Sequence, residues 1–175
     1  EVIKNLTKPE LVEILQDKPE VSIDLENNHH NSFFGNLYNC KEFIEQLDDR
    51  LQEIGHRDLQ SQFNFTFDYG HFATQAHYLN YDKREMLGDF FQSKGDRIKT
   101  LHLHVNDGIH KDQHIMPGLR AVELEGGKTA MGGKQVQLPL LEENQSILLE
   151  FLPLLEWKKR KNSNLVIEVD CVYTV

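Results

Sequence analysis

The chain lacks the features that mark several large classes of protein. No apolar run approaches the roughly 18 residues that a membrane-spanning helix needs, and no basic-then-apolar signal segment opens the chain. The two cysteines, Cys40 and Cys171, lie far apart and form no C-x-x-C pair. That spacing fits a reducing cytosol better than a disulfide framework. We therefore expect a cytoplasmic protein with no membrane segment.

The chain also has fewer basic than acidic residues. The 19 lysines and arginines face 28 aspartates and glutamates, which gives a net charge of −9. This charge argues against broad attraction to nucleic acid or to an anionic lipid surface. The chain instead has 39% hydrophobic residues over 175 positions, enough for one core, and a high count of nine histidines.

The order of predicted elements indicates parallel strands joined by helical crossovers. Helices and strands alternate along the chain, and the strands lie 30 to 60 residues apart. A glycine-rich loop is predicted over 106–138. The predicted strands are 21–26, 63–68, 98–105 and 165–170; the predicted helices are one opened by a capping box at 7–10, then 40–54, 81–94 and 141–159.

Each predicted strand has one apolar and one polar face. In FNFTFD (63–68) three phenylalanines alternate with Asn, Thr and Asp, and in LHLHV (101–105) apolar residues alternate with two histidines. A doubly wound sheet is covered on both faces, so its strands are nearly continuously apolar. One polar face suits a (β/α)8 TIM barrel, where helices cover the outside and functional groups project inward.

The polar face of each strand ends in an ionisable residue. In a barrel the carboxyl ends of the strands converge on one mouth, so these four groups are expected to meet at a cation. A mixed oxygen and nitrogen ligand set suits a divalent ion such as Mn, Mg, Co, Fe or Zn better than soft copper. The four residues are Glu26, Asp68, His104 and Glu168. His102, on the same face as His104, is expected to lie deeper and to be structural.

Five short segments resemble the xylose-isomerase-like TIM barrel superfamily over about residues 20 to 170. This superfamily contains sugar-phosphate isomerases and epimerases, and also apurinic endonucleases of the endonuclease IV type. The segments occur in the expected order: LEN (25–27), FDYGH (67–71), HLHVNDG (102–108), DQHIMPG (112–118) and VIEVD (166–170).

The resemblance implies roles for particular residues. Glu26, Asp68, His104 and Glu168 match the central metal ligands, and His71 matches a histidine that contacts substrate in epimerases or a neighbouring zinc in endonucleases. Glu26 and Glu168 would then act as base and acid on the two faces of a sugar or sugar-phosphate substrate, with proton transfer through a metal-stabilised enediolate. The remaining assignments are Asp112 and His114 as additional metal ligands and Arg120 as a substrate phosphate contact.

Two other functions stay open at this point. Asp112 and His114 match the pair that supplies a further zinc in the endonucleases, so hydrolysis at abasic DNA sites is one alternative. The net charge of −9 disfavours a nucleic-acid partner. The other alternative is a metal-binding barrel without catalysis, since Arg120 stands where the family usually has the second glycine of Pro-Gly-x-Gly.

Only about half of a barrel is expected within residues 1–175. Four strands are predicted, whereas a complete TIM barrel has eight strands and about 250 residues. The chain also begins with Glu1. We expect a single TIM-barrel domain that is incomplete at both ends. The alternative is that another chain supplies the missing strands, and a homo-oligomer is compatible with the sequence.

Overall fold

The fold is described from a computed structural model of the chain. It describes residues 1–28, 33–107, 109, 114, 123–124, 128–131, 134–136, 138–151, 153 and 164–167. The helices are α1 (Val2–Leu6), α2 (Pro9–Asp17), α3 (Leu37–Glu53), α4 (Tyr69–Leu79), α5 (Lys83–Lys94) and α6 (Leu138–Phe151), with 3-10 turns η1 (Phe33–Gly35), η2 (Arg57–Gln62) and η3 (Gly95–Arg97). The strands are β1 (Ile23–Glu26), β2 (Phe63–Asp68), β3 (Ile98–Leu103), β4 (Glu123–Leu124), β5 (Lys128–Met131), β6 (Lys134–Val136) and β7 (Asn164–Ile167).

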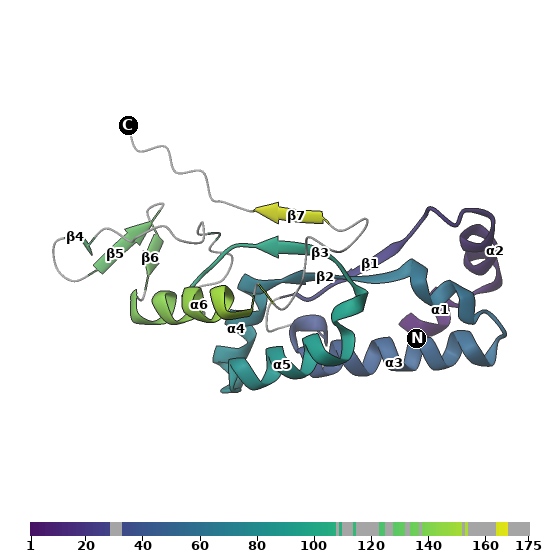
Figure 1. Cartoon of the computed structure of the whole chain (residues 1–175), viewed down its shortest axis with the longest axis horizontal. Coiled ribbons are helices and arrows are strands. Elements are labelled where there is room, and N and C mark those ends of the chain that lie inside the picture. The colour runs from purple at the N-terminus through teal and green to yellow at the C-terminus, as the bar shows by residue number, and fades with distance from the viewer. Residues whose placement is uncertain are drawn as a thin grey trace.

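The main sheet is parallel and has the order β1-β2-β3-β7. Along the chain, each of these strands is added on the same side of the previous one. In a doubly wound sheet the strand order instead reverses at a switch point, where new strands are added on the other side of the first. Right-handed crossovers that always advance in one direction place every helix on the same face. Helices α3, α4, α5 and α6 indeed lie together below the sheet (Figure 1). The α/β class and the parallel sheet are confirmed, and barrel closure stays a prediction.

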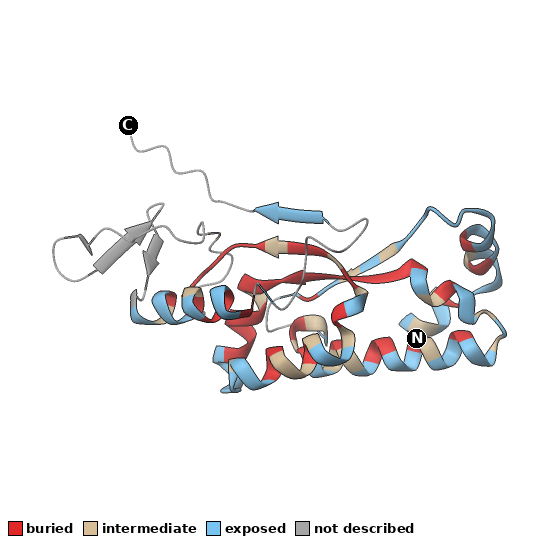
Figure 2. Ribbon diagram, in the orientation of Figure 1, coloured by how far each residue is buried: buried red, intermediate tan, exposed pale blue. Residues whose placement is uncertain are grey.

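The hydrophobic core lies between the sheet and this helical layer. Phe65 and Phe67 of β2 pack against Phe90 and Phe91 of α5, with ring centroids 5.2 Å apart in the pairs Phe65–Phe90 and Phe67–Phe91. The predicted packing of these phenylalanines beneath helices is therefore confirmed. Strand β2 is buried along its whole length, as Figure 2 shows.

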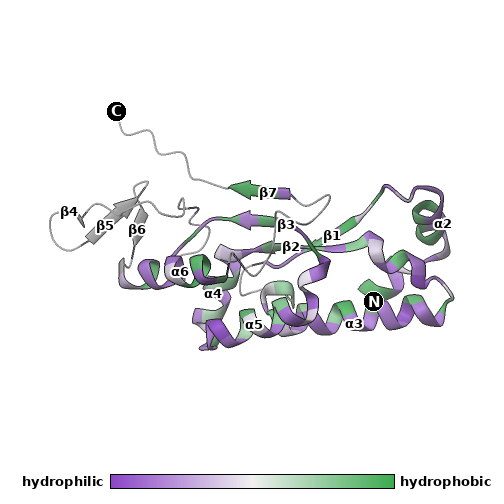
Figure 3. Cartoon of the chain, viewed as in Figure 1, coloured by the Kyte–Doolittle hydropathy of each residue, from purple (hydrophilic) through white to green (hydrophobic). Residues whose placement is uncertain are grey.

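Strand β7 departs from the predicted pattern. Leu165 and Ile167 were expected beneath the helices, but each is about half exposed, and all four residues of β7 are exposed. The strand is apolar in Figure 3 and exposed in Figure 2. Among the strands that the structure describes, β7 is at the edge of the sheet and pairs with β3, so fewer described neighbours bury its side chains.

Several local predictions need correction. The capping box at 7–10 is wrong: the Thr7 hydroxyl donates to the Ile3 carbonyl at 2.9 Å, and Lys8 precedes α2 without a side-chain cap. Thr7 thus closes α1, a helix that the sequence pattern did not predict. Pro9 still opens α2, because its fixed φ suits the first helical turn. The predicted loop at 106–138 contains the antiparallel strands β4, β5 and β6.

Cys40 is a buried thiol in α3. Burial raises its pKa from 9.0 to about 12, although hydrogen bonding to the backbone partly opposes the shift. Among the helices that the structure describes, none has the length and apolar character needed to span a membrane.

We expect the Cys40 thiol to resist reagents at pH 8 until the protein unfolds. Its folded pKa is raised, so its contribution to stability is complete below pH 9 and is lost as the pH rises from 9 to about 12. Thiol titration in a Cys171→Ser background, with and without guanidinium, checks the protection. Rapid labelling of Cys40 in the native protein would contradict this protection. The Cys40→Ala variant should not show the loss of stability between pH 9 and about 12 that ionisation of the Cys40 thiol causes.

Candidate metal centre

The polar residues of β1, β2 and β3 meet at the carboxyl ends of the strands because of one irregularity in register. Phe65 pairs with Ile98, but the next residue, Thr66, pairs with Thr100, so Lys99 is an extra residue in β3. This β-bulge lets Ile98 and Leu101 both join the core. It also sets Asp68 directly beside His102 rather than beside an apolar residue.

Asp68 is the centre of the cluster. Its carboxylate lies 2.9 Å (Oδ1) and 3.0 Å (Oδ2) from Nε2 of His104. Oδ2 is also 3.6 Å from Nδ1 of His71 and 3.7 Å from Nδ1 of His102. Oδ2 of Asp68, at the end of β2, therefore has three imidazole nitrogens within 3.7 Å. They belong to His71 near the start of α4, His102 of β3 and His104 just after β3.

The environment of Asp68 keeps it ionised. Burial by itself would raise the pKa of this carboxyl, but hydrogen bonds from His102 and His104, and positive charge on His104 and His71, outweigh burial. The pKa is consequently held well below its usual range. An ionised carboxylate in a dry position is the state in which a cation is bound most strongly.

His71 is oriented from two sides. Its backbone N–H donates to Oδ1 of Asp68 at 2.7 Å, so Asp68 caps the N-terminus of α4. Its Nδ1 lies 3.1 Å from the carbonyl oxygen of Asn27. When the ring is neutral, an Nδ1–H donated to that carbonyl leaves the Nε2 lone pair to bind a metal in place of a proton.

Glu26 and His102 form the other side of the cluster. Nδ1 of His102 is 3.2 Å from Oε1 of Glu26 across β1 and β3. Two groups of residues thus bring their ligand atoms within 4.8 Å of one another, Asp68–His71–His104 and Glu26–Asp68–His102, and Asp68 belongs to both.

Buried polar residues hold the cluster in place. The side chain of Asn27 donates to the Asp68 carbonyl at 2.8 Å and accepts from the Asp68 N–H at 2.7 Å, which ties the end of β1 to the end of β2. Asn106 donates to the Gly70 carbonyl at 2.8 Å, and Asn144 of α6 donates to the Asn106 carbonyl at 2.9 Å. The segment that follows β3 is therefore anchored to α4 and α6.

The structure brings together the five sequence-predicted site residues that it describes. Glu26, Asp68, His71 and His104 lie in the cluster, and the ring of His114 lies 4.3 Å from that of His104. Glu168, Asp112 and Arg120 lie outside the described residues. Their predicted roles as ligands and substrate contact stay predictions.

Sequence reasoning underrated three residues. His102 was expected to be structural or to support the ligands from deeper in the barrel, and it is a member of the cluster. Its position on the same strand face as His104 was the available signal. Asn27 and Gly70 lie within the segments LEN (25–27) and FDYGH (67–71), but nothing in those segments revealed the hydrogen bonds of Asn27 to Asp68 or the close approach of His104 to Gly70.

Comparison with protein-family models, with curated proteins and with solved structures finds no match to this chain. The functional interpretation therefore rests on the residues of the cluster and on the resemblance of the five short segments.

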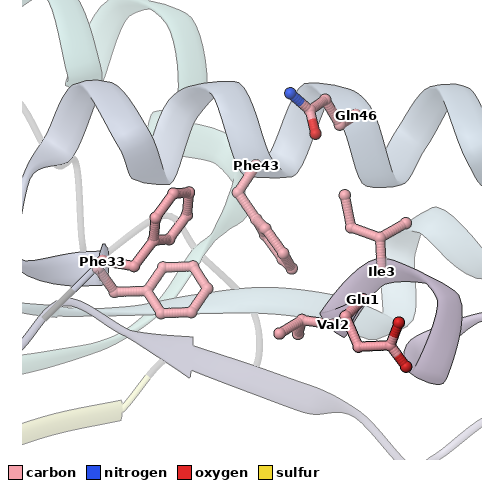
Figure 4. Close-up of a pocket in the computed structure, with 7 residues that line it drawn as sticks. Glu1, Val2, Ile3, Phe33, Phe43 and Gln46 are labelled. Carbon is pink, nitrogen blue, oxygen red and sulfur yellow. The ribbon is translucent and has the colours of Figure 1, made fainter.

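Two described hollows lie away from the cluster. One, of about 260 Å³, is mainly apolar and is lined from α1, η1 and α3 by residues that include Val2, Phe33 and Phe43 (Figure 4). The other, of about 330 Å³, lies between α4, α5 and α6 and is lined by residues that include His77, Lys83 and Glu143. Neither is lined by a member of the cluster, so neither is assigned to its chemistry.

Proposed function

We propose that this protein is a divalent-metal-dependent enzyme of the sugar or sugar-phosphate isomerase and epimerase type. One observation carries the proposal: two carboxylates and three imidazoles meet at the carboxyl ends of β1, β2 and β3. Parallel sheets of α/β proteins place their active sites at this end of the strands.

The cluster fits a divalent cation. Asp68 and His104 are fully buried, and their ligand atoms face each other at 2.9 Å. With His71 they offer one oxygen and two nitrogen ligands, a set that suits Zn, Co, Fe or Mn better than copper. We propose Glu168 as a further ligand. A divalent ion held by these residues would supply positive charge that stabilises negative charge developing on a substrate oxygen.

The exposed fraction of each side chain separates the residues proposed to hold a cation from those proposed to border a substrate. The side chains of Asp68 and His104 are only 1% and 0% exposed, so they hold a cation and do not meet substrate. The side chains of Glu26 and His71 are 42% and 17% exposed. We propose that Glu26 takes a proton from a substrate carbon, while His71 borders the substrate and uses its two nitrogens for the Asn27 carbonyl and the cation. We propose Glu168 as the partner acid or base and Arg120 as the phosphate contact.

One contact favours a second candidate function. The rings of His104 and His114 lie 4.3 Å apart, and with His71 they make a group of imidazoles that suits several zinc ions. Such a site fits hydrolysis of a phosphodiester at an abasic DNA site. The net charge of −9 weighs against DNA as the substrate.

Hydrogen exchange with solvent tests the leading proposal. Metal-free protein reloaded with Mn, Co, Mg or Zn is incubated in deuterium oxide with a panel of aldoses, ketoses and their phosphates. We expect metal-dependent loss of the proton NMR signal at the carbon next to the carbonyl. Glu26→Gln should slow the exchange by about 10²–10⁴-fold, the usual value of general base catalysis.

The control is His77→Gln, which changes an exposed histidine of α4 outside the cluster and should leave exchange unaltered. Absence of exchange with every metal and every sugar would contradict the isomerase proposal. Zinc-dependent cleavage of a duplex with one abasic site would then favour the endonuclease alternative. Metal binding without either reaction would favour a barrel that binds metal without catalysis.

A further inference from the structure

We propose that Glu26, Asp68 and His102 form a second cation site beside the first, and that Asp68 bridges the two ions. The inference rests on the proposed function, because it assumes that Asp68, His71 and His104 bind the first divalent ion. It adds a ligand, His102, that neither the strand pattern nor the resemblance to the isomerase superfamily assigned to a metal.

The measured distances between the ligand atoms of these residues match those between two ligands of one metal ion. Zinc lies about 2.0–2.2 Å from nitrogen and oxygen ligands, so two ligands of one ion are roughly 3–4 Å apart. Nδ1 of His102 lies 3.2 Å from Oε1 of Glu26 and 3.7 Å from Oδ2 of Asp68. The ligand atoms of all three residues lie within 4.8 Å of one another, so the three donors converge on one small volume.

Charge favours an ion at this position. Two carboxylates converge on one imidazole nitrogen, which has at most one proton to donate and so can neutralise only part of their repulsion. A divalent cation interacts with both carboxylates and with the imidazole lone pair. The half-exposed Glu26 leaves this position open to solvent, whereas the first site is enclosed by Asp68 and His104.

Asp68 has the geometry of a bridging ligand. Its Oδ1 and Oδ2 lie 2.9 and 3.0 Å from Nε2 of His104, a proposed ligand of the first ion, and Oδ2 lies 3.7 Å from Nδ1 of His102, a proposed ligand of the second. Enzymes with two metals place the ions about 3.5–4 Å apart and use both to hold adjacent oxygens of one substrate. In this arrangement Glu26 would hold the second ion through Oε1, and its other carboxylate oxygen would stay available for the proton transfer proposed above.

Zinc stoichiometry of the full chain tests the proposal. After removal of metal with a chelator, protein is equilibrated by dialysis against micromolar Zn²⁺ and its zinc content is measured by elemental mass spectrometry. We expect two equivalents for the wild type, one for His102→Gln and one for Glu26→Gln. The control His77→Gln should keep two. Circular dichroism shows whether each variant is folded. If His102→Gln is unfolded, the zinc content of Glu26→Gln still tests the second site.

Electron paramagnetic resonance of the Mn²⁺ form gives a second measurement. Two Mn²⁺ ions that share Asp68 should couple and lose the ordinary six-line signal, and His102→Gln should restore that signal from a single ion. One equivalent in the wild type would overturn the second site and leave the proposed function standing. Two equivalents that persist in His102→Gln would place the second ion elsewhere and also overturn it. No bound metal would overturn both proposals.

Discussion

Replacing Gly70 by alanine is expected to displace His104 and to weaken metal binding by on the order of 10–100-fold. A Cβ atom at position 70 would overlap Cε1 and Nδ1 of the His104 imidazole and would lie 2.7 Å from its Nε2. The ring cannot simply turn aside, because His104 is completely buried. Overpacking of this kind costs about 1–3 kcal/mol of stability in addition.

Gly88→Ala is the matched control. Gly88 also lies in a helix, α5, but a Cβ there meets nothing within 4 Å. Alanine at that position should stabilise the protein by about 0.5–1 kcal/mol, because glycine is the more flexible residue in the unfolded chain. Urea denaturation and zinc affinity measure both variants. Equal stability and equal affinity in the two would show that the His104 ring does not rest on Gly70.

Asn27→Ala is expected to destabilise the protein by several kcal/mol. The Asn27 side chain is fully buried and makes paired hydrogen bonds with the N–H and the carbonyl of Asp68. Its loss leaves both backbone groups without these bonds in a dry position, at about 1–3 kcal/mol for each. The end of β2 should loosen, and zinc affinity should fall together with stability.

Hydrogen exchange separates this effect from general destabilisation. The amide of Asp68 should lose protection in Asn27→Ala, while amides in the middle of α3 should change only as far as global stability does. Asn5→Ala, an exposed position in α1, should alter stability by no more than about 0.5 kcal/mol. A stability of Asn27→Ala close to that of Asn5→Ala would contradict the role of the paired bonds.

Alternation within single segments was sufficient to predict much of the sheet. FNFTFD (63–68) is a strand over the predicted residues, and its phenylalanines face the core while Asp68 ends the polar face. The pattern is local, because successive side chains of an extended strand point to opposite faces whatever the partner strand is. For the same reason Glu26, Asp68 and His104 were predicted from strand phase before any contact between them was known.

Helix α4 was not predicted, although it positions His71. Its sequence begins with Tyr69 and Gly70 directly after a strand, where a loop is the usual expectation. The helix starts there because Asp68 caps it, with Oδ1 accepting the His71 N–H at 2.7 Å. One carboxylate thus serves as a helix cap and as the centre of the cluster, and a pattern of apolar residues cannot reveal that double role.

The sequence by itself determined the α/β class, the polar strand face and the candidate ligands among the described residues. Only the tertiary structure decided which of them meet. The extra residue Lys99 sets the register that puts His102 beside Asp68, and the approach of His104 requires Gly70. Register depends on the free energy of pairing between strands that are distant in sequence, and alternation within one strand carries no information about it.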